Sequence, residues 1–580
     1  MPELASPPCP APTTIGWRGG LLVAAVALAL MLATEPRLAI TWDEGYTLGR
    51  VARVRAWFTL LAHPGRIESW RDPPEFDLVQ PDRADAVAVP RPIVTCRADL
   101  LRPAAIAWFW PFAREEPHGH PPFYGWVALL GDLLTPGRAP LARARLGPMI
   151  VFSLTAGAIF VSLARRQGAR SGGAAAGAWV LHPHLFALGH YAHYDALLSG
   201  LWMGALLAFA AAVEGRRRRG AVVLFGLLAG LAAATKFTGW LLPLPLLAWS
   251  VWRRDRRALV VLVWGGLVAA ATLYVVTPPF WFDPVGGVQR FLESNLTRAR
   301  TIPLPVQFLG EVIKTPIRSL PWYNTLLWTV LATPVGLLVL GVWGAAFALR
   351  HSLTRGERTS DPLPGLVLSS WVFLLVLRAL PHTPGHDGVR QFLPAFGCLA
   401  VLAGLGAARA VACLGRRGRA LVVLGLAEAA VSVGLMMPVP LSYFSPLAGG
   451  LPGAARLGME PTFYWDALDP DTFAWLNQHT APDRKVEFSS YPLSLRYLRQ
   501  IGWLTAEMRR EIDRPVAWYV LQNRPGLFRP IDRELLARGR PARVVRKWGV
   551  PLVLIYADSE RRRLESPRKD GLKIPVVAIP

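Results

Sequence analysis

The first 440 residues of the chain alternate between long apolar runs and short polar segments. A helix needs about 20 such apolar residues to cross the hydrocarbon core of a bilayer. The pattern therefore predicts about 11 membrane-spanning helices, near residues 17–40, 146–164, 173–192, 196–214, 219–235, 237–252, 258–277, 325–349, 363–380, 391–413 and 420–440. Residues 121–134 form a shorter apolar stretch that contains Asp132, so we expect them to lie as a helix in the outer membrane interface.

Arginine clusters occupy every second segment between the predicted spans. They lie at residues 165–170, 216–219, 253–257, 350–358 and 416–419. Because cytoplasmic loops carry an excess of Lys and Arg, this alternation predicts a cytoplasmic N-terminus and a C-terminus on the outer face. The first span has the apolar core of a secretory signal, but further spans follow it, so we interpret it as an uncleaved anchor.

This topology predicts three parts along the chain. They are a cytoplasmic tail at residues 1–16, a transmembrane domain at 17–440 and an outer segment at 441–580. Two long loops of the transmembrane domain, residues 41–145 and 278–324, are expected on the same outer face.

The outer segment differs in pattern from the rest of the chain. Runs at 515–523 and 550–558 are typical of strands, and runs near 471–478 and 532–538 are typical of helices. The predicted fold class is therefore an all-α polytopic membrane protein with a small α/β extracytoplasmic C-terminal domain.

Composition agrees with a membrane protein and excludes other classes. Of the 580 residues, 52% are hydrophobic and 18% are charged, and the mean hydropathy is +0.32. The net charge of +24 could indicate nucleic-acid binding, but the arginines lie in short clusters between apolar runs, so no nucleic-acid partner is predicted. The four cysteines, Cys9, Cys96, Cys398 and Cys413, fit neither a metal motif nor a disulfide framework.

Ionisable residues at the outer ends of the spans are the candidate functional residues. The stretch "AITWDEGYTLGR" places Asp43 and Glu44 directly after the first span. Charged groups at this depth are costly unless they serve a function or find a partner. The other candidates on the outer face are His118, His120, Arg145, His193, Asp195, Lys236, Asp283, His386, Asp387 and Arg390.

Simpler interpretations stay open for several of these residues. Arg145, Arg390 and Lys236 can serve as interface anchors whose charged ends reach the headgroups. His118 and His120 with a carboxylate could bind a divalent metal, but their spacing is weak support, and no metal ligands and no firm cofactor are predicted.

An ordered set of motifs resembles the GT-C membrane glycosyltransferases. "TWDEGYT", "HPPFYGW", "ARLG", "HYDALL", "TKFTG" and "DGVRQFLP" follow one another along the chain, within a resemblance that covers about residues 15–470. They are similar to the dolichyl-phosphate-mannose protein mannosyltransferase and aminoarabinose-transferase-like group. The resemblance implies transfer of a sugar from a polyprenyl-phosphate donor to an outer-face acceptor, with inversion at the anomeric carbon.

The resemblance also implies roles for particular residues. Asp43 matches the acidic residue expected to act as general base, and Glu44 matches its acidic neighbour. Arg145 matches an arginine expected near the donor phosphate. Asp195 and Lys236 match polar positions of the site. The protein mannosyltransferases carry a large β-trefoil in an outer loop, for which no segment of this chain is long enough, so protein O-mannosylation is in doubt.

The reaction chemistry is compatible with the residues. A lipid phosphate leaves as an anion, so the reaction needs one base for the acceptor proton rather than the acid–base carboxylate pair of a glycosidase. Cations must hold the phosphate while negative charge develops on it, and Arg145, Lys236 and Arg390 are candidates. His120 and Asp387 complete the predicted substrate-binding set.

Three other functions compete with this interpretation. They are a lipid-linked glycan ligase or polymerase, a secondary transporter, and a membrane-anchored scaffold. A transporter usually has internal repeats and midplane charges, which this sequence lacks. The acceptor could be a lipid, a glycan or a protein, and membrane lipids are the other expected partners. The excess of Arg over Lys is typical of a GC-rich genome, so we expect a bacterial inner membrane.

Overall fold

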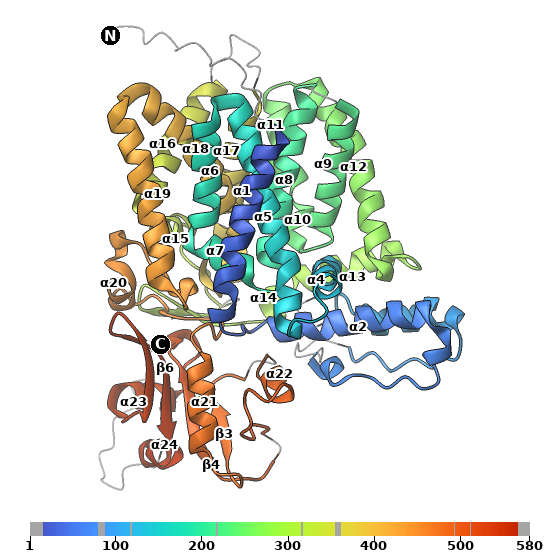
Figure 1. Cartoon of the computed structure of the whole chain (residues 1–580), viewed down its shortest axis with the longest axis vertical. Helices are drawn as coiled ribbons and strands as arrows, with labels where there is room; N and C mark the ends of the chain where they lie inside the picture. Colours follow the sequence, from blue (N-terminus) through green and yellow to red (C-terminus); the bar gives the residue numbers. More distant parts are fainter. Residues whose placement is uncertain are drawn as a thin grey trace.

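The computed structural model describes residues 16–78, 87–116, 119–215, 218–314, 317–353, 361–491, 494–510 and 512–565. A helical bundle makes up most of the molecule, and a small α/β domain lies against one end of it (Figure 1). We call this end of the bundle the domain end. The N-terminus of helix α1 lies at the opposite end.

The bundle contains a helix at every predicted span. Its helices are α1 (Trp17–Thr34), α5 (Pro140–Gln167), α6 (Ala169–Leu181), α7 (Pro183–His190), α8 (Tyr194–Val213), α9 (Arg218–Ala233), α10 (Phe237–Trp240), α11 (Pro243–Trp252), α12 (Arg256–Val276), α15 (Asn324–Ala332), α16 (Val335–Leu353), α17 (Leu363–Ala379), α18 (Leu393–Leu414) and α19 (Arg416–Met436). Among the described residues, 7 helices are long and apolar enough to cross a membrane. The other helices of the bundle are shorter, so the number of 11 membrane spans remains a prediction.

Prolines break three of the predicted spans, and one of them, at 237–252, divides into α10 and α11 before Pro243. The span at 173–192 divides into α6 and α7 at Pro183, and the span at 325–349 divides into α15 and α16 next to Pro334. Proline lacks an amide proton and disfavours helical geometry in the residue before it, so each span restarts after the proline. The breaks at Pro183 and Pro334 lie toward the domain end, where α7 and α15 lie in Figure 1.

Helix α18 is the centre of the bundle and packs against α6, α8, α16 and α17. Its contact with α16 depends on two glycines. A Cβ on Gly344 would lie 1.8 Å from the carbonyl oxygen of Leu402, and a Cβ on Gly406 would lie 1.9 Å from that of Leu340. Small residues that allow such close backbone approach are typical of membrane helix pairs.

The loop predicted at 41–145 contains helices that cover the domain end. Helix α4 (Phe123–Leu134) confirms the short helix predicted at 121–134, and it packs on α5 and on α2 (Glu44–Ala62). Helix α2 lies across the bundle axis and was not predicted (Figure 1). Its apolar pattern is interrupted by two buried arginines. Arg50 pairs with Glu116 at 3.1 Å, and Arg53 donates to the carbonyl of Trp108 at 3.0 Å.

Shorter elements complete the domain end. They are α3 (Pro103–Phe109), α13 (Pro284–Leu296), α14 (Arg298–Thr301), α20 (Gly450–Arg456), and an antiparallel hairpin of β1 (Val306–Phe308) and β2 (Glu311–Ile313). The hairpin contacts the C-terminal domain through residues 525–527.

The C-terminal domain confirms the predicted α/β class. Its four-stranded sheet has the order β3 (Lys485–Phe488), β4 (Val516–Gln522), β6 (Val550–Ala557) and β5 (Arg543–Lys547). Strands β3 and β4 are parallel, and the other pairs are antiparallel. The helices are α21 (Pro470–His479), α22 (Ser494–Gln500), α23 (Pro530–Arg538) and α24 (Asp558–Glu565). The runs predicted as strands at 515–523 and 550–558 correspond to β4 and β6, whose inner residues are buried.

Candidate active site

Asp43 and Glu44 lie where the link from α1 turns into α2, and their side chains enter two different clusters. Asp43 is the N-cap residue of α2 and Glu44 is its first residue, and both are buried. The domain end places α5, α7, α8 and the segment before α18 around this turn. Adjacent carboxylates therefore have separate surroundings.

The first cluster, which we call the Glu44 cluster, contains Glu44, Arg145, Glu35 and Thr41. Arg145 donates to the Glu44 carboxylate through Nε at 2.7 Å and Nη2 at 2.8 Å. It also donates to Glu35 at 3.1 Å and to the carbonyl of Ala39 at 2.6 Å. The carboxylate of Glu44 accepts further bonds from the amides of Thr41 and Ala192.

Glu44 is held in its charged form by these contacts. Burial raises the pKa of a carboxyl, but the charge and hydrogen bonds of Arg145, with the two amides, outweigh burial and lower the pKa of Glu44. The guanidinium of Arg145 is only 1% exposed and its donors are engaged inside the cluster. The structure therefore does not bring Arg145 to Asp43, because its partners are the carboxylates and carbonyls on the other side of the turn.

The second cluster, which we call the Asp43 cluster, contains Asp43, Asp195, Lys236, Asp387 and Arg390. Arg390 donates to Asp43 at 2.7 Å and contacts Asp387 at 2.8 Å and Asp195 at 3.5 Å. Lys236 donates to Asp195 at 2.6 Å. The structure thus joins five of the predicted site residues, from four separate segments of the chain, into one buried network of alternating charge.

Two tyrosine hydroxyl groups cover the Asp43 carboxylate. Tyr194 donates to it at 2.9 Å, and the hydroxyl of Tyr464 also hydrogen-bonds it. The guanidinium of Arg390 lies over the Tyr464 ring, 4.3 Å from its centroid. Tyr464 and Trp465 have φ values of 74° and 61°, a left-handed conformation that is strained for bulky residues. The segment around Tyr464 is therefore held against Asp43 at a conformational cost.

The network extends into the C-terminal domain through Arg524, which follows β4. Arg524 contacts the free side of the Asp387 carboxylate at 2.8 Å and Glu460 at 3.5 Å. Burial raises the pKa of Asp387, but Arg390 and Arg524 together outweigh burial and lower it. Burial raises the pKa of Glu460, and the nearby Arg524 only partly offsets this effect.

The histidines near the site are buried. Burial lowers the pKa of His386 to about 3, although Asp387 opposes the effect. Its ring nitrogen lies 3.2 Å from the Gln391 amide. The ring of His120 packs 3.9 Å from that of Tyr194, and its backbone amide donates to Glu116 at 3.0 Å. His120 therefore lies beside the Asp43 cluster rather than in it.

No group of three or more His, Cys, Asp and Glu side chains in the described ranges is arranged to hold a metal ion. His118, which the sequence analysis considered as a ligand, lies outside these ranges. Asp283 is likewise not brought to the site. It caps α13 at the protein surface and pairs with Arg290 at 2.9 Å.

Sequence reasoning missed four residues of the site. Tyr194 lies inside the motif "HYDALL", in which only Asp195 was predicted as a site residue. Arg298, on α14, lies close enough to lower the pKa of Lys236 and of His386. Tyr464 and Arg524 lie in segments with no periodic or motif signal. Only tertiary packing brings them to Asp43.

Part of the chain matches a known protein family. Residues 119–282 match the family model described as dolichyl-phosphate-mannose-protein mannosyltransferase. The segment includes His120, Arg145, Asp195 and Lys236. No curated protein sequence matches the chain.

Several solved structures resemble the chain. The crystal structure of ArnT from Cupriavidus metallidurans bound to undecaprenyl phosphate is 17% identical, with a TM-score of 0.51, and the match covers 96% of this chain and 100% of that one. The apo state of the same protein matches at 17% identity and a TM-score of 0.48, over 94% and 99% of the chains. An oligosaccharyltransferase from Archaeoglobus fulgidus is 11% identical, with a TM-score of 0.47, over 87% and 69%.

The first of these structures establishes an ArnT-like architecture over nearly the whole chain. With the family match, it confirms the predicted resemblance to the GT-C membrane glycosyltransferases. The apolar helices of the bundle make the chain an integral membrane protein.

Proposed function

We propose that this protein is a glycosyltransferase that moves a sugar from a polyprenyl-phosphate donor to a hydroxyl group of an acceptor, with inversion, and that Asp43 is the general base. The observation that carries the proposal is the contact of Arg390 with the buried carboxylate of Asp43 at 2.7 Å, beside Asp195 and Lys236. A base and two cations then lie within one site, as transfer from a lipid phosphate requires.

The roles follow from the charges in the Asp43 cluster. Asp43 takes the proton of the acceptor hydroxyl while the acceptor oxygen forms a bond to the anomeric carbon. The bond from that carbon to the phosphate oxygen breaks at the same time, and its electron pair leaves with the polyprenyl phosphate. Arg390 and Lys236, with Arg298 nearby, stabilise the developing negative charge.

An acceptor can reach the Asp43 carboxylate only after a side chain that covers it moves away. The carboxylate is 3% exposed and is covered by the hydroxyl groups of Tyr194 and Tyr464. An acceptor hydroxyl can reach Asp43 by taking the place of one of these phenols. The strained conformation of Tyr464 makes it the easier of the two to displace.

Glu44 and Arg145 have a positioning role in this proposal. Their paired side chains fix the turn that presents Asp43, because the two carboxylates are consecutive on the backbone. The donor phosphate is then held by the cations of the Asp43 cluster rather than by Arg145.

The membrane arrangement completes the proposal. The arginine-rich loops are expected in the cytoplasm. The domain end and the candidate site would then lie on the outer face of a bacterial inner membrane. The N-terminus would be cytoplasmic and the C-terminal domain extracytoplasmic. A polyprenyl-phosphate sugar would then enter from the bilayer, as the undecaprenyl phosphate in the ArnT structure suggests.

The test uses the purified full chain in lipid with a panel of radiolabelled polyprenyl-phosphate sugars and compares it with the Asp43→Asn variant. We expect one donor to be consumed, and consumption to fall roughly 10²- to 10⁴-fold in the variant. The matched control is Asp283→Asn, an exposed carboxylate on the same end of the molecule, which should consume the donor at the original rate.

Equal consumption by the original chain and by Asp43→Asn would contradict the base assignment and direct attention to Asp195. Consumption of a lipid-diphosphate oligosaccharide in place of every monophosphate sugar would favour the ligase. Uptake of a sugar into vesicles without transfer would favour the transporter.

A further inference from the structure

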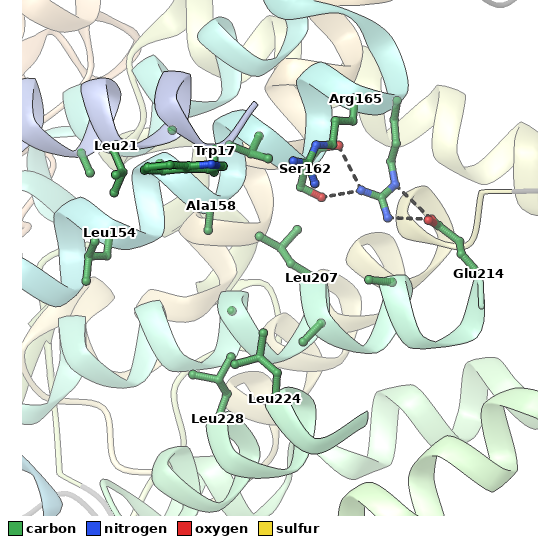
Figure 2. Close-up of a pocket in the computed structure, with 18 residues that line it drawn as sticks. Trp17, Leu21, Leu154, Ala158, Ser162, Arg165, Leu207, Glu214, Leu224 and Leu228 are labelled. Atoms are coloured by element: carbon green, nitrogen blue, oxygen red, sulfur yellow. Dashed lines mark hydrogen bonds and ion pairs between the residues drawn. The ribbon is translucent and has the colours of Figure 1, made fainter. Parts of the chain in front are cut away.

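Exposed apolar side chains are expected along the apolar helices of the bundle. Leu21, Leu154 and Leu224, on α1, α5 and α9, line a cavity of about 800 Å³ at the end of the bundle away from the C-terminal domain (Figure 2). Side chains of this kind face the hydrocarbon of the bilayer and need no other partner. Exposed apolar side chains on short loops at the domain end, outside the spans, do require an explanation.

Four apolar side chains are exposed around helix α20. Leu309 begins the turn between β1 and β2, and Trp548 begins the turn between β5 and β6. Leu447 and Leu457 lie on either side of α20 in the sequence. All four are between 39% and 55% exposed. Apolar side chains on a water-facing surface normally occur singly, so a group of four indicates a surface that contacts a partner or a membrane.

The two turns contact opposite ends of α20. A Cβ on Gly450, at the start of the helix, would lie 3.7 Å from the Trp548 ring. The amide of Gly310 donates to the carbonyl of Gly458 at 2.9 Å, just after the helix ends. Because α20 has 7 residues, it is about 10 Å long, so the four side chains lie close together. We call these side chains the α20 patch: Leu309, Leu447, Leu457 and Trp548.

Both turns place a bulky residue in the left-handed region. The φ values are 50° and 84° for Leu309 and Gly310, and 48° and 80° for Trp548 and Gly549. A two-residue hairpin turn with two positive φ values usually begins with Asn or Asp, which adopt this conformation more readily than Leu or Trp. The same exception in two turns beside one helix indicates that apolar side chains serve a purpose at these positions.

Two contacts with membrane helices set the depth of the α20 patch. Lys547, next to Trp548, donates from Nζ to the carbonyl of Met437 at 2.9 Å, directly after the last residue of α19. The amide of Ser445 donates to the carbonyl of Leu331 at 2.7 Å, near the C-terminal end of α15. Figure 1 shows α20 beside the same end of α19. The patch therefore lies at the level where the last apolar helix leaves the bundle.

Basic side chains border the α20 patch. Arg456 is the last residue of α20, and Arg546 precedes Lys547; both arginines are exposed. Guanidinium groups at this level meet the phosphates of lipid headgroups, while Trp and Leu side chains reach the boundary of the acyl chains. A protein partner on this surface would have to lie at the same depth, among the headgroups. The surroundings therefore favour a lipid surface.

We propose that the α20 patch inserts into the headgroup region of the bilayer that the bundle spans, and that it anchors the C-terminal domain to the leaflet at the domain end. Trp548 and Leu447 contact the acyl-chain boundary, and Arg456 and Arg546 bind phosphate groups. The inference does not depend on the proposed transferase activity, because it involves no residue of the Asp43 cluster or the Glu44 cluster. It adds a lipid contact to the packing of α22 on α2, which also holds the domain.

The test identifies the molecule that contacts the patch. The full chain carries photoreactive benzoylphenylalanine in place of Trp548 and is placed in vesicles of phosphatidylcholine and phosphatidylglycerol. After irradiation and digestion, mass spectrometry should detect a phospholipid adduct at this position. Benzoylphenylalanine in place of Leu447 should give the same kind of adduct, so the result does not depend on the folding of one variant.

The matched control is Trp503 in the same domain. Trp503 is 45% exposed, against 44% for Trp548, and it lies three residues after α22, which Figure 1 places on the opposite side of the domain from α20. Benzoylphenylalanine at position 503 should form no lipid adduct. The absence of lipid adducts at both patch positions, or equal yields at 503 and 548, would overturn the proposal. An adduct with a second protein chain instead of lipid would also overturn it and would identify the patch as a protein interface.

Discussion

The guanidinium of Arg524 contacts the carboxylate of Asp387 at 2.8 Å, across the junction between the C-terminal domain and the helical bundle. The same carboxylate contacts Arg390 at 2.8 Å, and Arg390 in turn donates to Asp43. Arg524 is 3% exposed, so water screens this chain of charges little. The C-terminal domain is thus connected to the proposed base through two intervening side chains.

Replacing Arg524 should therefore lower catalysis from a distance. We expect Arg524→Gln to reduce kcat by roughly 10- to 100-fold, because Asp387 loses one of its two cations and Arg390 then shifts from its position at Asp43. The KM for the donor should change less than kcat. Steady-state transfer assays on the protein in lipid measure both constants.

The control for this variant is Arg529→Gln in the same domain. Arg529 is 45% exposed and contacts Glu487 and Asp532 rather than the site. Its substitution should leave both kinetic constants unchanged. Partial rescue by Arg524→Lys, which restores the charge without the planar geometry, is expected as well. Unchanged kcat in Arg524→Gln would disprove the positioning role.

Glu44→Gln should act mainly on stability. The substitution removes the charge that faces the bidentate Arg145 and leaves a buried guanidinium with Glu35 as its remaining carboxylate. Breaking a buried pair in this way costs roughly 3–5 kcal/mol. Thermal unfolding in detergent should show a clearly lower midpoint than for Asp283→Asn, while the folded fraction keeps measurable transfer. A stable but inactive Glu44→Gln variant would instead assign Glu44 to the chemistry.

The sequence predicted the positions of the helices better than the composition of the site. Apolar runs are local signals, so each predicted span coincides with a helix or a proline-broken pair of helices. The buried strands β4 and β6 were visible for the same reason. Helix α2 was missed because Arg50 and Arg53 interrupt its apolar pattern, and their partners, such as Glu116, lie far along the chain.

The candidate site was also predicted from local signals, and residues brought to it only by tertiary packing were missed. Charged residues at span ends pointed to Asp43, Asp195, Lys236, Asp387 and Arg390, which the fold brings together. The local pattern of residues does not separate Asp43 from Glu44, since the two are consecutive and differ only in what surrounds them, and the preference for Asp43 came from the family resemblance alone. Tyr464 is 421 residues from Asp43 along the chain, and no periodicity links the two.

Ionisation of the buried Asp466 carboxyl should lower the free energy of unfolding as pH rises. Burial raises the pKa of its carboxyl from 3.8 to about 7, and the hydroxyl of Thr462, at 2.8 Å, and a backbone hydrogen bond offset this effect only in part. Between these two pH values the folded chain keeps a proton that the unfolded chain has lost, so stability falls with rising pH and levels off above about pH 7. The total loss is about 4 kcal/mol.

Thermal unfolding at pH 5 and pH 8 checks this expectation for the original chain and for Asp466→Asn. The neutral amide cannot ionise, so the variant should lose less stability between the two pH values. Asp283→Asn, whose exposed carboxyl is not raised in pKa, is the control and should keep the original dependence. The same pH dependence in Asp466→Asn and in the original chain would contradict the assignment.

Deprotonation of Lys236 should lower the transfer rate at alkaline pH. Burial lowers the pKa of its amine, and Arg390 adds to this effect, while Asp195 opposes it. The proposed role requires the charged amine, so transfer should decline as pH rises through a pKa below the ordinary value of 10.5. In Lys236→Arg the guanidinium stays charged throughout this range. We therefore expect the decline to move to higher pH or to disappear, whereas Lys236→Met should be weakly active at every pH. Transfer rates measured from pH 6 to pH 10.5 test this prediction. If the decline in Lys236→Arg occurs at the same pH as in the original chain, the decline belongs to another titrating group.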